Sequence, residues 1–241
     1  MRVSVIAPVL NEAPWIGYSI MAALPGIHSF HYGIDRKSHD GTKELVQHIA
    51  KGEGAGRVFW YQDAAFDIDP INRVQYNGAF DVLIGAAIAH GAEAIWFLHP
   101  DMIVLNPEAI QAMDDTAMAW HTNMTSYAED FKTVITKGRA NKWKNIHAAR
   151  FGVHYYGGYG SQNEDFYHKD LTGTSYNHYG EKFGLYPYRV GDSGLNINHY
   201  CELKPYKRRF EKMKSCMKTL SPHWTEDTLN SMASQHPRVS L

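Results

Sequence analysis

Short apolar runs recur through the first hundred residues, and a polar or helical stretch follows each of them. The first run, Arg2 to Val9, is rich in β-branched residues and almost continuously apolar, which predicts a strand buried on both faces. Similar runs predict three further strands, at Phe30 to Ile34, Val58 to Tyr61 and Ala94 to Leu98.

Apolar residues at helical spacing predict a helix after each of the first three strands. Asn11 can cap the first helix, and Asp40-Gly41-Thr42 is a turn that opens the second. The third helix is long, over residues 71–90, with Phe80 and Ile88 expected among its inward residues. This alternation predicts an α/β fold with a mostly parallel central sheet flanked by helices.

The second half of the chain is less regular. Residues 128–150 are basic and expected to be helical, residues 152–162 are rich in Gly and Tyr and expected to form a loop, and Lys204 to Lys218 is expected to be a basic helix. The sequence contains no internal repeat and no clear linker, so we expect a single domain over residues 1–241.

Composition excludes several classes of protein. The 241 residues are 44% hydrophobic and 20% charged, which excludes a disordered or collagen-like chain. Apolar runs such as Ala92 to Leu98 are too short to span a bilayer, and the N-terminus lacks the pattern of a signal peptide. With only Cys201 and Cys216, no disulfide framework is expected, which favours a reducing, cytoplasmic location and no transmembrane segment.

Charge divides the chain into two parts. Residues 1–131 carry 7 Lys and Arg against 16 Asp and Glu, whereas residues 132–241 carry 17 against 9. The excess of positive charge in the second part suggests that it faces an anionic partner, although the two parts could equally attract each other within one fold.

Polar residues gather where three of the predicted strands end: Asn11-Glu12, Asp35 to Asp40, and His99 to Asp101. Ligands of parallel α/β sheets bind beyond the carboxyl ends of the strands. The three clusters are therefore expected to lie along one edge of the sheet and to form a binding site.

These clusters resemble the motifs of family 2 glycosyltransferases. The run from Val5 to Glu12 resembles that family's opening strand with Pro-x-x-Asn-Glu, and the run from Ile34 to Thr42 resembles its Asp-x-x-Ser-x-Asp-Gly-Thr. His99-Pro100-Asp101 resembles its Asp-x-Asp metal motif, with His99 in place of the first aspartate. The resemblance covers about residues 3–110 and implies a GT-A fold, with residues 1–115 binding the nucleotide sugar and 116–241 forming the acceptor side.

The resemblance implies a set of donor-binding residues. Main-chain groups from Pro8 to Leu10 would contact the base, and the Asp35 carboxylate can accept a hydrogen bond from a base imide N–H. The expected nucleotide-binding residues are Pro8, Leu10, Asn11, Glu12, Asp35, Arg73, His99, Pro100 and Lys204.

A divalent metal, Mn²⁺ or Mg²⁺, is implied at Asp101 and His99, since carboxylate and imidazole are both competent ligands. The same substitution by His99 could instead mean weak or absent metal dependence. His199 is the favoured third ligand and His178 the alternative, with Lys204, Arg208 and Arg209 placed to hold a leaving diphosphate.

Transfer with inversion needs a carboxylate base. Glu164-Asp165 resembles the family's Glu-Asp pair, which favours Asp165 as the base, with Asp192 as the competitor. Tyr155, Tyr156, Tyr159 and Trp143 could stack on a sugar or a base.

We therefore expect a glycosyltransferase that uses a nucleotide-diphosphate sugar, with UDP-sugar favoured as the donor. The acceptor could be a glycan or, as the lesser hypothesis, nucleic acid such as a hydroxylated base in phage-type DNA. The alternatives are a sugar nucleotidyltransferase and a non-catalytic nucleotide-sugar-binding module. No Gly-x-Gly-x-x-Gly follows the first strand, which excludes a plain Rossmann dehydrogenase.

Overall fold

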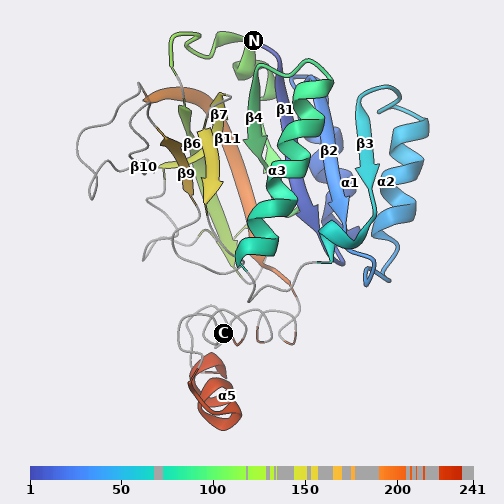
Figure 1. The fold of residues 1–241 in the computed structure, drawn as a ribbon, viewed down its shortest axis with the longest axis vertical. Coiled ribbons are helices and arrows are strands. Elements are labelled where there is room, and N and C mark those ends of the chain that lie inside the picture. Colours follow the sequence, from blue (N-terminus) through green and yellow to red (C-terminus); the bar gives the residue numbers. More distant parts are fainter. Residues whose placement is uncertain are drawn as a thin grey trace.

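A central eight-stranded sheet organises the protein (Figure 1). The computed structural model describes residues 1–67, 73–117, 119–128, 131–132, 134, 144–150, 153–156, 165–169, 175–176, 190–204, 207, 210, 214 and 223–234. The strands of this sheet are β1 (Val3–Val9), β2 (Ser29–Ile34), β3 (Val58–Tyr61), β4 (Ala94–Phe97), β5 (Met102–Val104), β6 (Ala119–Ala128), β7 (Lys144–Arg150) and β11 (Val190–Glu202).

The strand order is β3-β2-β1-β4-β7-β6-β11-β5. The first four strands are parallel, as are β6 and β11, whereas β7 and β5 run antiparallel to their neighbours. The prediction of an α/β fold with a mostly parallel sheet is confirmed. The four strands predicted in the first hundred residues are all present, within one residue of the expected bounds.

Three helices cover the parallel part of the sheet. Helix α3 (Arg73–Ala89) packs on β1 and β2 from one face, and α1 (Ala13–Ala23) and α2 (Thr42–Lys51) lie against the other (Figure 1). Two short 3₁₀ helices, η1 (Ala64–Phe66) and η2 (Pro107–Ala112), and the terminal helix α5 (Glu226–Ser234) complete the set described. None of the helices in the described residues is long and apolar enough to cross a membrane.

The second half contains more strand than its sequence predicts. Residues 144–150 form β7 inside the large sheet, so the expected basic helix is wrong there. A second, antiparallel sheet contains β8 (Val153–Tyr156), β9 (Asp165–Lys169) and β10 (Ser175–Tyr176), so the expected loop is wrong at 153–156. Strand β7 pairs with β4, which lies far earlier in the sequence, and local spacing does not report such pairing.

Strand β1 is the centre of the core, because it is covered on both faces. Val5, Ile6 and Ala7 are fully buried, as the continuous apolar run predicts. Helix α3 buries Phe80, as expected, but the prediction for Ile88 is wrong, because its side chain is 48% exposed.

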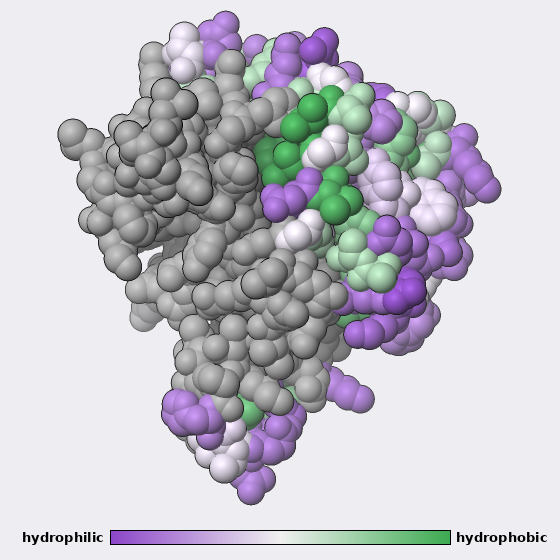
Figure 2. Space-filling model, viewed as in Figure 1, coloured by the Kyte–Doolittle hydropathy of each residue, from purple (hydrophilic) through white to green (hydrophobic). Residues whose placement is uncertain are grey.

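The buried stripe of α3 runs through Ala79, Leu83 and Ala87, at intervals of four residues. Phe80 lies beside this stripe and is buried with it, whereas Ile88, in the last turn of the helix, and Val82 are exposed. Apolar side chains accordingly gather on the molecular surface over α3 (Figure 2).

Gly33 allows a close contact just before the end of β2. A Cβ atom on Gly33 would lie 2.2 Å from the ring of Phe66, which η1 places against the strand. The missing side chain therefore lets η1 pack directly on β2, two residues before Asp35.

Replacing this glycine should destabilise the fold. We expect Gly33→Ala to lower the free energy of unfolding by about 1–3 kcal/mol, because the ring of Phe66 must move. The matched control is Gly85→Ala on α3, where a Cβ meets nothing within 4 Å. That variant should be stabilised by up to about 1 kcal/mol, because alanine favours the helix. Urea unfolding of the two variants measures whether the free energy of unfolding falls in the first and rises in the second. A Gly33→Ala variant as stable as the parent would contradict the close packing of Phe66 on Gly33.

Candidate functional site

The polar clusters that follow β1, β2 and β4 lie together at the carboxyl edge of the sheet, where the end of β11 joins them. Hydrogen bonds link the first cluster to the second, and Lys204 forms ion pairs with both Glu12 of the first and Asp101 of the third. The structure therefore brings together residues that the sequence places far apart, at the edge where such sheets bind their ligands.

The loop after β1 is held by the loop after β2. The main-chain N–H of His39 donates to Oδ1 of Asn11 at 2.9 Å, and the N–H of Glu12 donates to Oγ1 of Thr42 at 2.7 Å. Asn11 has a φ of 55° and does not cap α1, whose N-cap residue is Glu12, so the expected cap is wrong. An asparagine tolerates this left-handed backbone, and its side chain is thereby turned toward His39.

Asp40 caps the two helices that flank this edge. Its carboxylate accepts a hydrogen bond from the N–H of Thr42, the first residue of α2, and another from the N–H of Ala13, the first residue of α1, both at 3.1 Å. A carboxylate at two helix N-termini satisfies free N–H groups and complements both helix dipoles. Asp40 therefore has a structural role.

Asp35 is buried at the end of β2, with only 2% of its surface exposed. Its Oδ1 accepts a hydrogen bond from the N–H of Lys37 at 2.8 Å, and its own N–H donates to the carbonyl of Val9 at 3.0 Å. Its Oδ2 is also buried and accepts no hydrogen bond from the described part of the chain. A buried acceptor without a partner is costly, so this atom is a candidate for contact with a ligand's N–H or O–H donor.

Asp101, after β4, is held by residues at the end of β11. Its side chain is 4% exposed, and its Oδ2 lies 2.7 Å from Nζ of Lys204, which also lies 3.1 Å from Oε1 of Glu12. Nε2 of His199 lies 3.7 Å from the other carboxylate oxygen of Asp101. The N–H of Tyr200 donates to the carbonyl of Asp101 at 3.0 Å and fixes the end of β11 beside this loop.

The side chains around Asp101 do not fit a divalent metal ion as they are arranged. A metal bound to a carboxylate lies about 2.0–2.6 Å from its oxygen, and the ammonium of Lys204 stands beside Oδ2 of Asp101. The His99 ring packs edge-on against Phe97, with ring centroids 4.3 Å apart. Within the described residues, no three His, Cys, Asp or Glu side chains converge on one point as a metal site would require.

The other expected site residues are only partly described. Arg73 begins α3 and Asp165 begins β9, where it pairs with Tyr156, but the described structure covers only the backbone of these residues. Glu164, His178, Arg208 and Arg209 lie outside the described residues, as do the side chains of Trp143, Tyr155 and Tyr159.

Asp192 is not brought to this edge. It is exposed near the start of β11, where its Oδ1 accepts a hydrogen bond from the N–H of Gly194 at 2.9 Å. Seven residues separate it from His199, which corresponds to roughly 20 Å along an extended strand. The site near Lys204 therefore lies at the other end of β11.

An aromatic group beside the ion cluster was not expected from the sequence. The rings of Trp15 and Tyr200 stack with centroids 5.5 Å apart, and Tyr127 and Phe131 lie against Tyr200 at 5.1 and 5.5 Å. Trp15 and Tyr200 each lie within three residues of a predicted site residue, and this proximity is the only sequence feature that could have indicated them. Such a cluster offers an apolar surface suited to a ring-shaped ligand.

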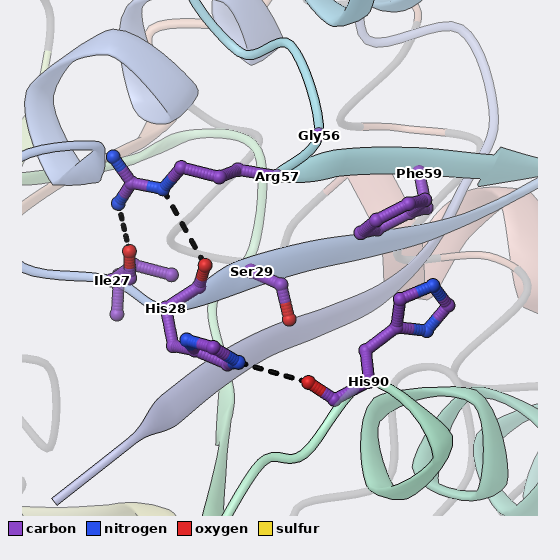
Figure 3. A pocket seen from close by; sticks show the side chains of 7 residues that line it. All are labelled: Ile27, His28, Ser29, Gly56, Arg57, Phe59 and His90. Atoms are coloured by element: carbon purple, nitrogen blue, oxygen red, sulfur yellow. Dashed lines mark hydrogen bonds between the residues drawn. The ribbon is translucent and has the colours of Figure 1, made fainter.

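A separate pocket of about 310 Å³ lies at the opposite, amino end of β2 and β3 (Figure 3). Its lining residues are Ile27, His28, Ser29, Gly56, Arg57, Phe59 and His90. Nε2 of His28 is 2.9 Å from the carbonyl of His90, and Arg57 donates to the carbonyls of Ile27 and His28. These polar groups tie the starts of β2 and β3 to the end of α3.

His31 is fully buried close to this pocket. Its ring nitrogens lie 2.9 Å from Oγ of Ser29 and 3.0 Å from the hydroxyl of Tyr61, and its ring stacks on Phe59. Burial lowers the pKa of His31 to about 4, and the charges of the nearby His90 and His28 act in the same direction. The folded protein therefore holds this imidazole neutral.

Comparison with known proteins identifies similar folds only. No protein-family model matches the sequence, and no curated protein matches it. Among solved structures 25 chains match. One is the crystal structure of GalNAc-T7 with UDP, GalNAc and Mn²⁺, at a TM-score of 0.45 and 11% sequence identity over 99% of this chain. The present chain spans about half of that protein, 52% of its length.

The buried histidine should make folding stability depend on pH. The unfolded chain binds a proton at His31 below pH 6.5, whereas the folded chain does so only near pH 4. The contribution of neutral His31 to the free energy of unfolding should therefore be fully present above pH 6.5. It should fall by on the order of 3 kcal/mol as the pH drops toward 4. The free energy of unfolding, measured in urea across this pH range, should lose this dependence on pH in His31→Gln. It should retain it in His48→Gln, because His48 is exposed on α2. Equal slopes in the two variants would contradict the assignment.

Proposed function

We propose that this chain transfers a sugar from a nucleotide-diphosphate donor, with a UDP-sugar favoured, to the hydroxyl of an acceptor. The observation that carries the proposal is the buried carboxylate of Asp35, whose Oδ2 meets no donor within the described residues. It lies at the strand-end edge that also holds the charged cluster around Asp101. One edge thus offers an acceptor for a base and charges for a diphosphate.

The donor is proposed to lie across the ends of β1, β2 and β4. Oδ2 of Asp35 would accept a hydrogen bond from the imide N–H of the base, beside main-chain groups of Pro8 to Leu10. The diphosphate would lie near Asp101, where Lys204 supplies positive charge and the ring nitrogen of His199 lies close by. A base end and a phosphate end at fixed separation would select nucleoside diphosphates over free phosphate.

The transfer itself needs a base and a leaving group. The acceptor hydroxyl would lose its proton to a carboxylate, for which Asp165 is proposed, with Glu164 beside it in sequence. The acceptor oxygen would then bond to the anomeric carbon as the bond from that carbon to the β-phosphate oxygen breaks, with inversion. The electron pair leaves with the nucleoside diphosphate, and no step is assigned to a metal ion.

The acceptor is proposed to be a glycan, with a hydroxylated DNA base as the lesser alternative. The aromatic group at Trp15 and Tyr200 supports contact with a sugar ring, and the positive balance of residues 132–241 would suit an anionic glycan or DNA. Binding of duplex DNA that weakens steeply with salt would favour the nucleic-acid acceptor. Absence of DNA binding at low salt would leave the glycan.

The experiment that tests the proposal is calorimetric titration with UDP, GDP and CDP, followed by transfer assays with the sugar donor of the nucleotide that binds. Binding of one of these nucleotides in preference to the other two is the expected result. Failure of all three to bind would overturn the proposed function.

Substitution of the base-binding carboxylate gives a sharper result. Asp35→Asn can keep the contact with the N–H of Lys37, but it can place an amide N–H where the base N–H would donate. We expect the affinity for the nucleotide to fall by about tenfold to a hundredfold, because two donors then face each other. The midpoint of thermal unfolding should not fall, since the buried carboxylate is removed.

Asp81→Asn is the control, because Asp81 is exposed on α3. It should bind the nucleotide as the parent does. An Asp35→Asn variant that folds and binds with the affinity of the parent would contradict the assignment of Asp35 to the base.

A further inference from the structure

The ammonium of Lys204 stands at the place where a cation for the diphosphate is expected. Nζ of Lys204 lies 2.7 Å from Oδ2 of Asp101 and 3.1 Å from Oε1 of Glu12. The three side chains come from the ends of β11, β4 and β1, so the charge is fixed at the centre of the strand-end edge.

This ion cluster is buried, with 8% of the Lys204 side chain and 4% of the Asp101 side chain exposed. Removing such groups from water costs more than a pair usually returns, so buried pairs are weak evidence of a stabilising role. Their presence at a ligand-binding edge favours a function in binding. A lysine at this position places its amino group between two strand-end carboxylates.

Lys204 and a divalent ion would compete for the same carboxylate oxygen. A metal must approach Oδ2 of Asp101 more closely than Nζ does, and it would meet a positive charge already in contact with that oxygen. The other oxygen faces Nε2 of His199 at 3.7 Å. Because an imidazole can itself ligate a metal, it is the ammonium of Lys204 beside Oδ2, and not His199, that stands where a metal would bind Asp101.

From this geometry we infer that Lys204 replaces a divalent metal as the cation that holds the donor's diphosphate. The inference deepens the proposed function and rests on it. Asp101 positions the ammonium through the shorter contact. The longer contact, to Glu12, is the one that a phosphate oxygen would take over, because charge-assisted hydrogen bonds strengthen as they shorten. The donor class is therefore a nucleoside diphosphate sugar bound without metal.

The first test is titration of the parent protein with UDP, GDP and CDP, each in EDTA and in Mn²⁺. We expect the affinity for the preferred nucleotide to differ by less than about twofold between the two conditions. Binding that appears only with Mn²⁺ would overturn the role of Lys204 and leave the proposed function intact. Binding of no nucleotide in either condition would overturn both.

The second test removes the ammonium. Lys204→Ala should bind the preferred nucleotide at least about tenfold more weakly in EDTA, since a charge-assisted contact is lost. A metal can then approach Oδ2 of Asp101 from the side that the ammonium occupied, so Mn²⁺ should restore binding to this variant, whereas it should change the affinity of the parent by less than about twofold. Lys204→Arg, which keeps the charge, should retain most of the affinity in EDTA.

Lys207→Ala is the matched control, because Lys207 is an exposed lysine three residues further along the chain. It should bind as the parent does in both conditions. Lys204→Ala that binds as tightly as Lys207→Ala in EDTA would overturn the inference. If Lys204→Ala fails to fold, the comparison of EDTA with Mn²⁺ on the parent and on Lys204→Arg still decides the question.

Discussion

The buried charge of Lys204 is the constraint on which the carboxyl edge of the sheet depends. An ammonium removed from water must keep its carboxylate partners, so the loops that follow β1 and β4 and the end of β11 must stay where Glu12 and Asp101 can reach it. Glu12 and Lys204 are 192 residues apart in sequence. The ion cluster therefore connects the loop after β1, the first strand in the sequence, to the segment after β11, the last strand of this sheet in the sequence.

The polar residues at this edge differ in how their side-chain oxygens are hydrogen-bonded. Asp40 and Asn11 use their oxygens to accept main-chain N–H groups, and these contacts hold the starts of α1 and α2 beside the loop after β2. Asp35 uses one oxygen in the same way, while its second is buried without a donor from the described residues. A buried acceptor of this kind contributes nothing to stability, and this is the observation on which the proposed contact with the base rests.

The two ends of the sheet differ in their chemistry. Charged side chains gather at the carboxyl end. The parallel strands end there next to helix N-termini, which favour anions. The amino end is closed by His28, His31 and His90, whose hydrogen bonds run to main-chain carbonyls and hydroxyls of neighbouring elements. The proposed donor site and the buried histidine that makes stability depend on pH therefore lie toward opposite ends of the strands.

Local sequence pattern was enough to predict the parallel part of the fold and much of its edge. Apolar runs such as Val3–Val9 must be buried on both faces, so four strands and their helices followed from local pattern, and with them the place of Asp35 and Asp101. Tertiary structure alone decided that β7 is a strand, that Asn11 does not cap α1, that Asp192 lies away from the site and that Lys204 reaches Asp101. Those outcomes depend on pairing between distant segments and on the cost of burying charge. The spacing of residue types along the sequence predicts neither of these.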